Sequence, residues 1–238
     1  MRIAPFRAFI FYSGYLSLII LNSTLYCLFW FLPKAYRQTI ETAFVPLMMA
    51  WLKITCHIDI VVHGKENIQR APCVVLCNHQ SSWETFYLQH LFRPTNVIVK
   101  KELLWIPFFG WALALSKAIA ISRSKPVGAL RQVLHQGKKC LQRGNNVIIY
   151  PEGSRSPSGS LAPFKSSAAA LAKSAGVAIV PVVHDAGLCW PAHQFVKRAG
   201  TITIHIGQPI ASDTASAKEL TCMAHTWCAK MLHLKTET

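Results

Sequence analysis

A histidine and a carboxylate at short spacing are the first candidates for chemistry in this chain. His79 follows the apolar residues 73–77 after a single asparagine, and Glu84 lies five positions further along. Five residues of helix correspond to a rotation of about 500°, so the two side chains meet only if His79 precedes a helix that holds Glu84 in its first turn. Imidazole has the pKa that suits a general base near neutral pH, and a carboxylate beside it fixes its tautomer. The spacing therefore favours a histidine base at a strand-to-helix junction.

A structural role for the same carboxylate remains open. Ser81 and Glu84 have the spacing of a capping box, in which the glutamate side chain binds a backbone N–H at the start of a helix. A single histidine in a loop is also commonly just solvated. The sequence around His79 thus leaves both a catalytic pair and a helix cap as interpretations.

A second polar turn follows another apolar run. Residues 147–150 are apolar, and Pro151, Glu152, Gly153, Ser154, Arg155 and Ser156 come next. Glycine lets the backbone approach a ligand closely, and a guanidinium binds phosphate through two parallel hydrogen bonds. A surface turn with a solvated arginine is the alternative. Neither a P-loop nor a dinucleotide fingerprint is present, so no nucleotide cofactor is indicated.

These turns need a scaffold of alternating strands and helices. Strands are expected at 58–62, 73–77, 97–99, 118–121, 147–150, 177–183 and 201–206, and helices at 83–92, 126–143, 166–175 and 215–232. Continuous apolar strands indicate burial on both faces, as in a parallel sheet covered by helices. The pattern predicts an α/β fold with a mostly parallel central sheet flanked by helices.

The N-terminal part has a different composition. Residues 8–33 form a run of 26 without charge, and a helix of about 20 apolar residues suffices to cross a bilayer core. A cleaved signal peptide is the competing interpretation, but its apolar stretch is shorter. Residues 42–52 are apolar but too short to span, so a single span and a re-entrant helical pair both remain open. We expect a membrane-anchoring helical segment over 1–56 and an α/β domain over 57–238.

Charge and cysteine content narrow the class of protein. The chain has 25 Lys and Arg against 10 Asp and Glu, a net charge of +15, yet 52% of its 238 residues are apolar. Such a basic surface attracts phosphates, anionic lipids or nucleic acid. The 8 cysteines lie mostly in apolar runs and include no pair at two-residue separation, which indicates reduced core residues. We expect no metal site.

The two polar turns also carry a family resemblance. NHQSSWET (78–85) and YPEGSRS (150–156) resemble the first and third sequence blocks of the glycerolipid acyltransferases, in particular the 1-acyl-sn-glycerol-3-phosphate acyltransferases. Residues 118–123 resemble the second block and 180–183 the fourth. The blocks stand in the family's order and cover roughly residues 58–210. Two positions depart from the family pattern, because Glu84 and Ser122 stand where aspartate is usual.

The resemblance implies transfer of a fatty acyl group to the sn-2 hydroxyl of 1-acyl-sn-glycerol-3-phosphate, which gives phosphatidic acid. The donor would be a thioester of acyl-carrier protein or coenzyme A, with no further cofactor. His79 would be the base and Glu84 its orienting acid. Residues expected to bind substrate are Arg123, Glu152, Gly153, Ser154, Arg155, Lys100 and Lys101. Glu152 would orient the cations, and either lysine could instead be simply solvated.

The expected partners follow from this activity. They are lysophosphatidic acid, the acyl donor and membrane lipids, and no nucleic acid. The expected location is the inner (cytoplasmic) membrane, with the catalytic domain on the cytosolic side. Another lysophospholipid acceptor is an alternative, and so is a non-catalytic, membrane-tethered binder of anionic lipid or nucleic acid. A serine hydrolase is disfavoured because the Gly-x-Ser-x-Gly elbow is lacking.

Cys77 raises a different mechanism, because it lies two residues before His79. A cysteine can take an acyl group first and pass it on. However, Cys77 ends an apolar run, where burial would raise its pKa and leave it unreactive. The sequence favours direct transfer over a ping-pong route.

Overall fold

A seven-stranded sheet forms the centre of the protein, in a computed structural model that describes residues 3–122, 124 and 126–233. The strand order is β1-β7-β6-β2-β5-β3-β4, and every pairing is parallel except that of β6 with β7. The strands are β1 (Ile58–His63), β2 (Val74–Cys77), β3 (Thr95–Lys100), β4 (Ile119–Ile121), β5 (Asn146–Ile149), β6 (Ile179–His184) and β7 (Gly200–Ile206). The predicted α/β fold with a mostly parallel sheet is confirmed.

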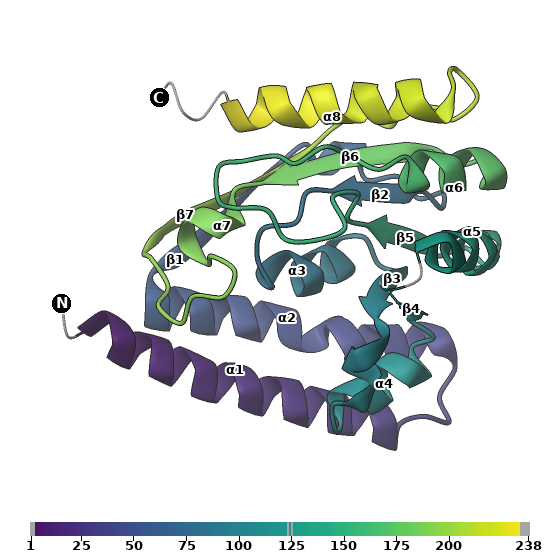
Figure 1. Cartoon of the computed structure of the whole chain (residues 1–238). Helices are drawn as coiled ribbons and strands as arrows, with labels where there is room; N and C mark the ends of the chain where they lie inside the picture. Colours follow the sequence, from purple (N-terminus) through teal and green to yellow (C-terminus); the bar gives the residue numbers. More distant parts are fainter. Residues whose placement is uncertain (1–2, 123, 125, 234–238) are drawn as a thin grey trace.

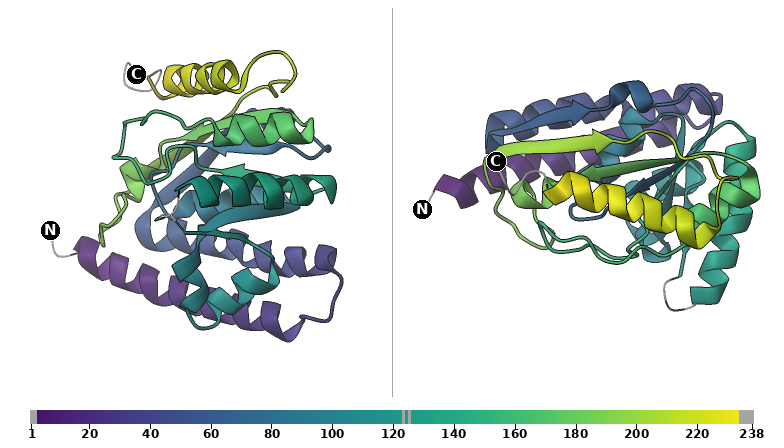
Figure 2. Two further views of the ribbon diagram at one scale, coloured as in Figure 1. Left: turned by 45° about the vertical axis from the view of Figure 1, so that its right-hand side comes forward. Right: turned by 90° about the horizontal axis from the view of Figure 1, so that it is seen from above.

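Helices cover both faces of this sheet. They are α1 (Ile3–Leu28), α2 (Lys34–Cys56), α3 (Trp83–Leu91), α4 (Phe109–Leu115), α5 (Pro126–Gln142), α6 (Ser167–Ala175), α7 (Ala186–Cys189) and α8 (Ala217–His233), with short 3-10 turns at Lys65–Asn67 and Lys101–Trp105. In Figure 1, α1, α2 and α3 lie below the sheet, whereas α8 lies above it. The turned views in Figure 2 keep this layering.

The two faces of the sheet bury two separate apolar clusters, as β2 illustrates. Cys73, Val75 and Cys77 face the cluster that includes residues of α1, α2 and α3. Val74 and Leu76 face the other cluster, which includes residues of α5, α6 and α8. Successive strand side chains point to opposite faces, so a strand buried on both faces reads as one continuous apolar run. This burial explains why the sequence predicted the central strands well.

The N-terminal helices pack on the sheet through one side and expose the other. Phe11 of α1 and Leu52 of α2 are fully buried in the same cluster as the strands. The outer side of α1 exposes large apolar side chains: Phe6, Phe9, Leu16, Ile20, Leu21, Leu25 and Leu28. Among the described residues, α1 is long and apolar enough to cross a membrane. An N-terminal helix of this kind is consistent with membrane association.

Three features of the fold differ from the sequence expectations. The apolar stretch 42–52 is the middle of the longer helix α2, which begins at Lys34 and contains Pro46. The sequence reading placed no helix at Phe109–Leu115 or Ala186–Cys189, where short helices occur. Short helices have too few turns to show a clear apolar period, which is why they escape a pattern search.

Candidate active site

The candidate residues gather where neighbouring parallel strands end. His79 follows β2, Glu152 and Arg155 follow β5, and Lys100 ends β3, which pairs with β5. The carboxyl ends of parallel strands meet at one edge of a sheet, and ligands of open α/β folds bind in the crevice outside that edge. The fold thus brings together turns that are far apart in the sequence.

The His79–Glu84 pair forms as the spacing predicts. His79 lies in the loop ahead of α3, Glu84 lies in the first turn of α3, and His79 Nδ1 is 2.7 Å from Glu84 Oε1. The same oxygen accepts the backbone N–H groups of Gln80 at 3.0 Å and Ser81 at 2.8 Å. Glu84 therefore caps the helix and orients the histidine at once, and the two interpretations are not exclusive.

Glu84 remains ionised although it is completely buried. Burial alone would raise its pKa, but the nearby His184, the hydrogen bond and charge of His79, and the Ser81 N–H together outweigh burial and lower the pKa. With Nδ1–H donated to Glu84, neutral His79 carries its lone pair on Nε2. That nitrogen can take a proton, and the adjacent carboxylate stabilises the imidazolium that results.

The turn after β5 holds His79 from the other side. Tyr150 stacks on the imidazole with a centroid separation of 4.4 Å, and the backbone N–H of Ser156 donates to His79 O at 2.8 Å. Glu152 Oε1 accepts the backbone N–H of His79 at 2.7 Å. The first and third sequence blocks are therefore one hydrogen-bonded unit, which fixes the position of His79.

Glu152 contacts the loop that carries His79. Its carboxylate is buried against the His79 backbone, and no ion pair joins it to a cation within the described parts of the chain. Burial raises its pKa to about 7. That Glu152 orients the cations stays a prediction, whereas its hydrogen bond to the loop that carries His79 is direct.

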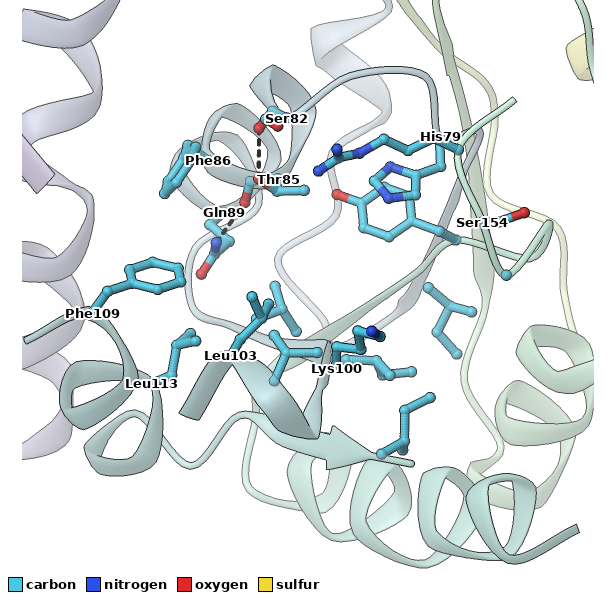
Figure 3. A pocket seen from close by; sticks show the side chains of 18 of the residues that line it. His79, Ser82, Thr85, Phe86, Gln89, Lys100, Leu103, Phe109, Leu113 and Ser154 are labelled. Atoms are coloured by element: carbon cyan, nitrogen blue, oxygen red, sulfur yellow. Dashed lines mark hydrogen bonds between the residues drawn. The ribbon is translucent and has the colours of Figure 1, made fainter. Parts of the chain in front are cut away.

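A cavity of about 1020 Å³ opens beside His79. His79 and Ser154 lie on one side of it in Figure 3, while the apolar side chains of Phe86, Phe109 and Leu113 lie across from them. The far walls come from α1 and α2, so the N-terminal helices are part of the site. A cavity of this size and lining accepts an extended apolar group with its polar end near the histidine.

Three described cations line this cavity beside His79: Lys100, Arg155 and Lys165. Lys101 is exposed and does not line it, so the structure separates the two predicted lysines. Gly153 also lines it with a φ of +80°, and an added Cβ there would lie 2.8 Å from Lys165 Nζ. The positive φ favours glycine at this position, whereas the flexible end of the lysine side chain could move away from an added Cβ.

One predicted residue lies outside the described structure, and three residues near His79 were not predicted. Arg123 lies outside the residues that the structure describes. The sequence reading missed Lys165 and Tyr150, although both stand within or shortly after the third block. It also missed His184, which ends the fully buried strand β6. A histidine at the carboxyl end of an apolar strand was the available signal, because such ends meet at the ligand edge of the sheet.

Replacing Cys77 with alanine should leave most of the activity, and donor alone should leave no acyl group on the protein. Cys77 is fully buried, and burial raises the pKa of its thiol well above its usual range, so little thiolate forms. Mass spectrometry of the denatured protein after incubation with donor checks this. A stoichiometric, hydroxylamine-sensitive adduct that is lost in Cys77→Ala would instead establish a ping-pong route.

The fold and the site together place a histidine–carboxylate pair beside a cavity with apolar walls, an arrangement that suits an enzyme with general-base chemistry. An acyltransferase family model matches residues 59–185. The chain is 43% identical to a 1-acyl-sn-glycerol-3-phosphate acyltransferase of Pseudomonas aeruginosa, over 76% of this chain and 72% of the relative. It is 32% identical to the yeast (Saccharomyces cerevisiae) enzyme of the same name, over 71% of this chain and 57% of the relative.

A solved structure agrees in fold. The crystal structure of a 1-acyl-sn-glycerophosphate (LPA) acyltransferase from Thermotoga maritima matches with a TM-score of 0.84 at 23% identity, and the match covers 99% of this chain and 97% of that one. The chain therefore belongs to the acyltransferase family, among its 1-acyl-sn-glycerol-3-phosphate acyltransferases.

Proposed function

We propose that this protein transfers a fatty acyl group from a thioester to the sn-2 hydroxyl of 1-acyl-sn-glycerol-3-phosphate and so forms phosphatidic acid. The observation that carries the proposal is the buried His79–Glu84 pair, 2.7 Å apart, at a cavity with apolar walls and cationic side chains near the histidine. The acceptor substrate is assigned from the names of the related bacterial and yeast enzymes. The donor is acyl-carrier protein or coenzyme A carrying the acyl group.

The reaction needs one proton moved twice. His79 Nε2 removes the proton of the sn-2 hydroxyl while the hydroxyl oxygen attacks the thioester carbonyl. Glu84 stabilises the imidazolium that forms. The tetrahedral intermediate expels the donor sulfur as a thiolate, which receives this proton from His79. An ester is formed, a thioester is broken, and the free thiol leaves with no change at the enzyme.

The acceptor's phosphate would lie against the cations of the cavity. Arg155 provides a guanidinium that can bind phosphate through two hydrogen bonds, and Gly153 leaves room for close approach. Lys100 is placed to contact the phosphate or the developing oxyanion, with Ser154 at the rim. We assign Arg123 to the same phosphate from its place in the second block.

Residues 1–56 form the membrane-anchoring part in this proposal and residues 57–238 the α/β domain. Support comes from the apolar outer side of α1, and from the cavity walls that α1 and α2 supply. A lipid acceptor could then enter from the bilayer. The bacterial relative supports an inner (cytoplasmic) membrane location, with the catalytic domain on the cytosolic side.

Membranes that contain the protein, incubated with labelled acyl donors and a panel of lysolipids, test the activity. Label should enter phosphatidic acid when lysophosphatidic acid is the acceptor. Transfer to a different lysolipid alone would change the acceptor assignment. Lipid binding without any transfer would instead favour a non-catalytic binder, whose affinity would fall steeply with salt.

Exchanging Arg155 for lysine should raise the KM for lysophosphatidic acid far more than the KM for the acyl donor. The exchange keeps the charge but loses the planar guanidinium that fits a phosphate. Steady-state kinetics with each substrate varied in turn measures the two effects. Arg143→Lys, an exposed exchange after α5 and outside the cavity lining, is the matched control. An effect confined to the donor would move Arg155 to the donor site.

A further inference from the structure

A second histidine lies behind the His79–Glu84 pair. His184 ends β6, is 1% exposed, and stands beside the loop that carries His79. The side chain of Asn78 joins the two segments, because its Nδ2 donates to His184 O at 2.9 Å and its Oδ1 accepts the His184 N–H at 3.0 Å. The histidine is thus held in register with the catalytic loop by paired hydrogen bonds.

The hydrogen bonds of His184 determine its tautomer. Its Nδ1 accepts the backbone N–H of Ala186 at 3.1 Å, so the ring proton is on Nε2. Nε2 lies 3.1 Å from Asn78 O, which accepts this proton. Burial lowers the pKa of His184, which keeps the ring neutral. The N–H of Nε2 is therefore a fixed donor at the back of the site.

This donor faces the unused oxygen of the catalytic carboxylate. Glu84 Oε1 is fully occupied by His79, Gln80 and Ser81, whereas Oε2 is buried and has no hydrogen-bond partner within the described chain. His184 Nε2 is 3.8 Å from Oε2. That separation is longer than a hydrogen bond but short enough for an attraction between the ring dipole and the carboxylate charge at a buried site.

We propose that His184 is a positioning residue of the acyl transfer, which acts by supporting the negative charge of Glu84 through its Nε2–H. A carboxylate with one bare oxygen in an apolar interior is costly to ionise. The proposal rests on the proposed function, since it assumes that His79 needs an ionised Glu84. His184 itself does not touch the reacting atoms.

Charged and titratable groups surround this pair on several elements. Glu84 on α3 faces His79 from the loop after β2 and His184 from β6, and Tyr150 and Glu152 lie near it from the segment after β5. Cys77 at the end of β2 is also near Glu84. Asp185 next to His184 accepts the Thr203 N–H of β7 at 2.7 Å and also interacts electrostatically with His184. Of these groups, His184 brings its Nε2 to 3.8 Å from Oε2.

The loss of His184 should change the pH profile in a defined direction. The active form has a neutral His79 and an ionised Glu84, and His184 stabilises the negative charge of Glu84. Without that support, the proton of the inactive form moves from His79 to Glu84, where it neutralises the buried carboxylate. The pair then releases its proton less readily, so the acidic limb of kcat/KM moves to higher pH.

Two exchanges at His184 test the proposal on the full-length, membrane-bound protein. His184→Phe keeps a ring but lacks the N–H, and we expect kcat to fall by about 10- to 100-fold, with the acidic limb moved upward and the KM for lysophosphatidic acid little changed. His184→Gln keeps an N–H donor at a similar reach and should restore most of kcat and most of the wild-type pH profile. His225→Phe, which removes a partly buried histidine of α8 packed on Phe164, is the control.

A double-mutant cycle separates this role from a merely structural one. In a Glu84→Gln background there is no charge to support, so His184→Phe should cause little further loss in kcat. If the phenylalanine variant fails to fold, His184→Asn, whose shorter amide cannot reach Glu84, replaces it in the cycle. Additive losses, or a wild-type pH profile in a folded His184→Phe or His184→Asn variant, overturn the proposal. Failure of the wild-type protein to transfer label to lysophosphatidic acid would instead overturn the proposed function itself.

Discussion

Replacing His79 with alanine should lower kcat by at least about 100-fold, the usual contribution of a positioned general base. Glu84 binds His79 at Nδ1, Glu152 binds the backbone N–H of His79, and Tyr150 stacks on the imidazole. The imidazole borders the cavity. No other described histidine combines a carboxylate at hydrogen-bonding distance with a place in this cavity lining. Acyl transfer measured with saturating donor and acceptor checks the expectation.

A matched control distinguishes loss of the base from loss of the fold. His135→Ala removes an exposed imidazole of α5 outside the cavity lining and should leave kcat unchanged. Membrane association of His79→Ala should persist, because the exposed apolar side chains of α1 are untouched. Near-normal turnover in a folded His79→Ala protein would mean that another group removes the proton.

Local parts of the site could be predicted from the sequence. The His79–Glu84 contact depends on five residues of chain and on where one helix begins, and both can be read from an apolar strand followed by a capping pattern. The joining of His79 to the turn at Glu152 could also be anticipated, because parallel strands end at a common edge. These inferences need only short-range geometry and the order of the strands.

Long-range parts of the site could not be predicted in this way. Asn78 and His184 are 106 residues apart, and their contact depends on β6 lying directly beside β2. The strand order that creates this contact is set by the packing of whole helices on the sheet. The same holds for the cavity walls that α1 and α2 supply, since the sequence indicated a membrane anchor but not that Tyr15 and Phe44 would line the site.

Exchanging Glu84 for glutamine should lower kcat by on the order of 10³-fold, although the fold is preserved. The exchange keeps an oxygen that can accept the backbone N–H groups of Gln80 and Ser81, so the cap of α3 survives. It removes the negative charge that stabilises the His79 imidazolium, and the equivalent loss in a serine protease triad costs about 10⁴-fold. Circular dichroism and thermal unfolding should therefore change little while turnover collapses.

Glu84→Asp separates the charge from the reach of the side chain. Aspartate keeps the charge but is shorter by one methylene, so the bond to His79 Nδ1 requires a small shift of the helix start. We expect this variant to retain more activity than the glutamine variant, because charge matters to the transition state and the cap tolerates either side chain. If the glutamine variant were as active as the wild type, Glu84 would serve only to start α3, and His79 would act without an electrostatic partner.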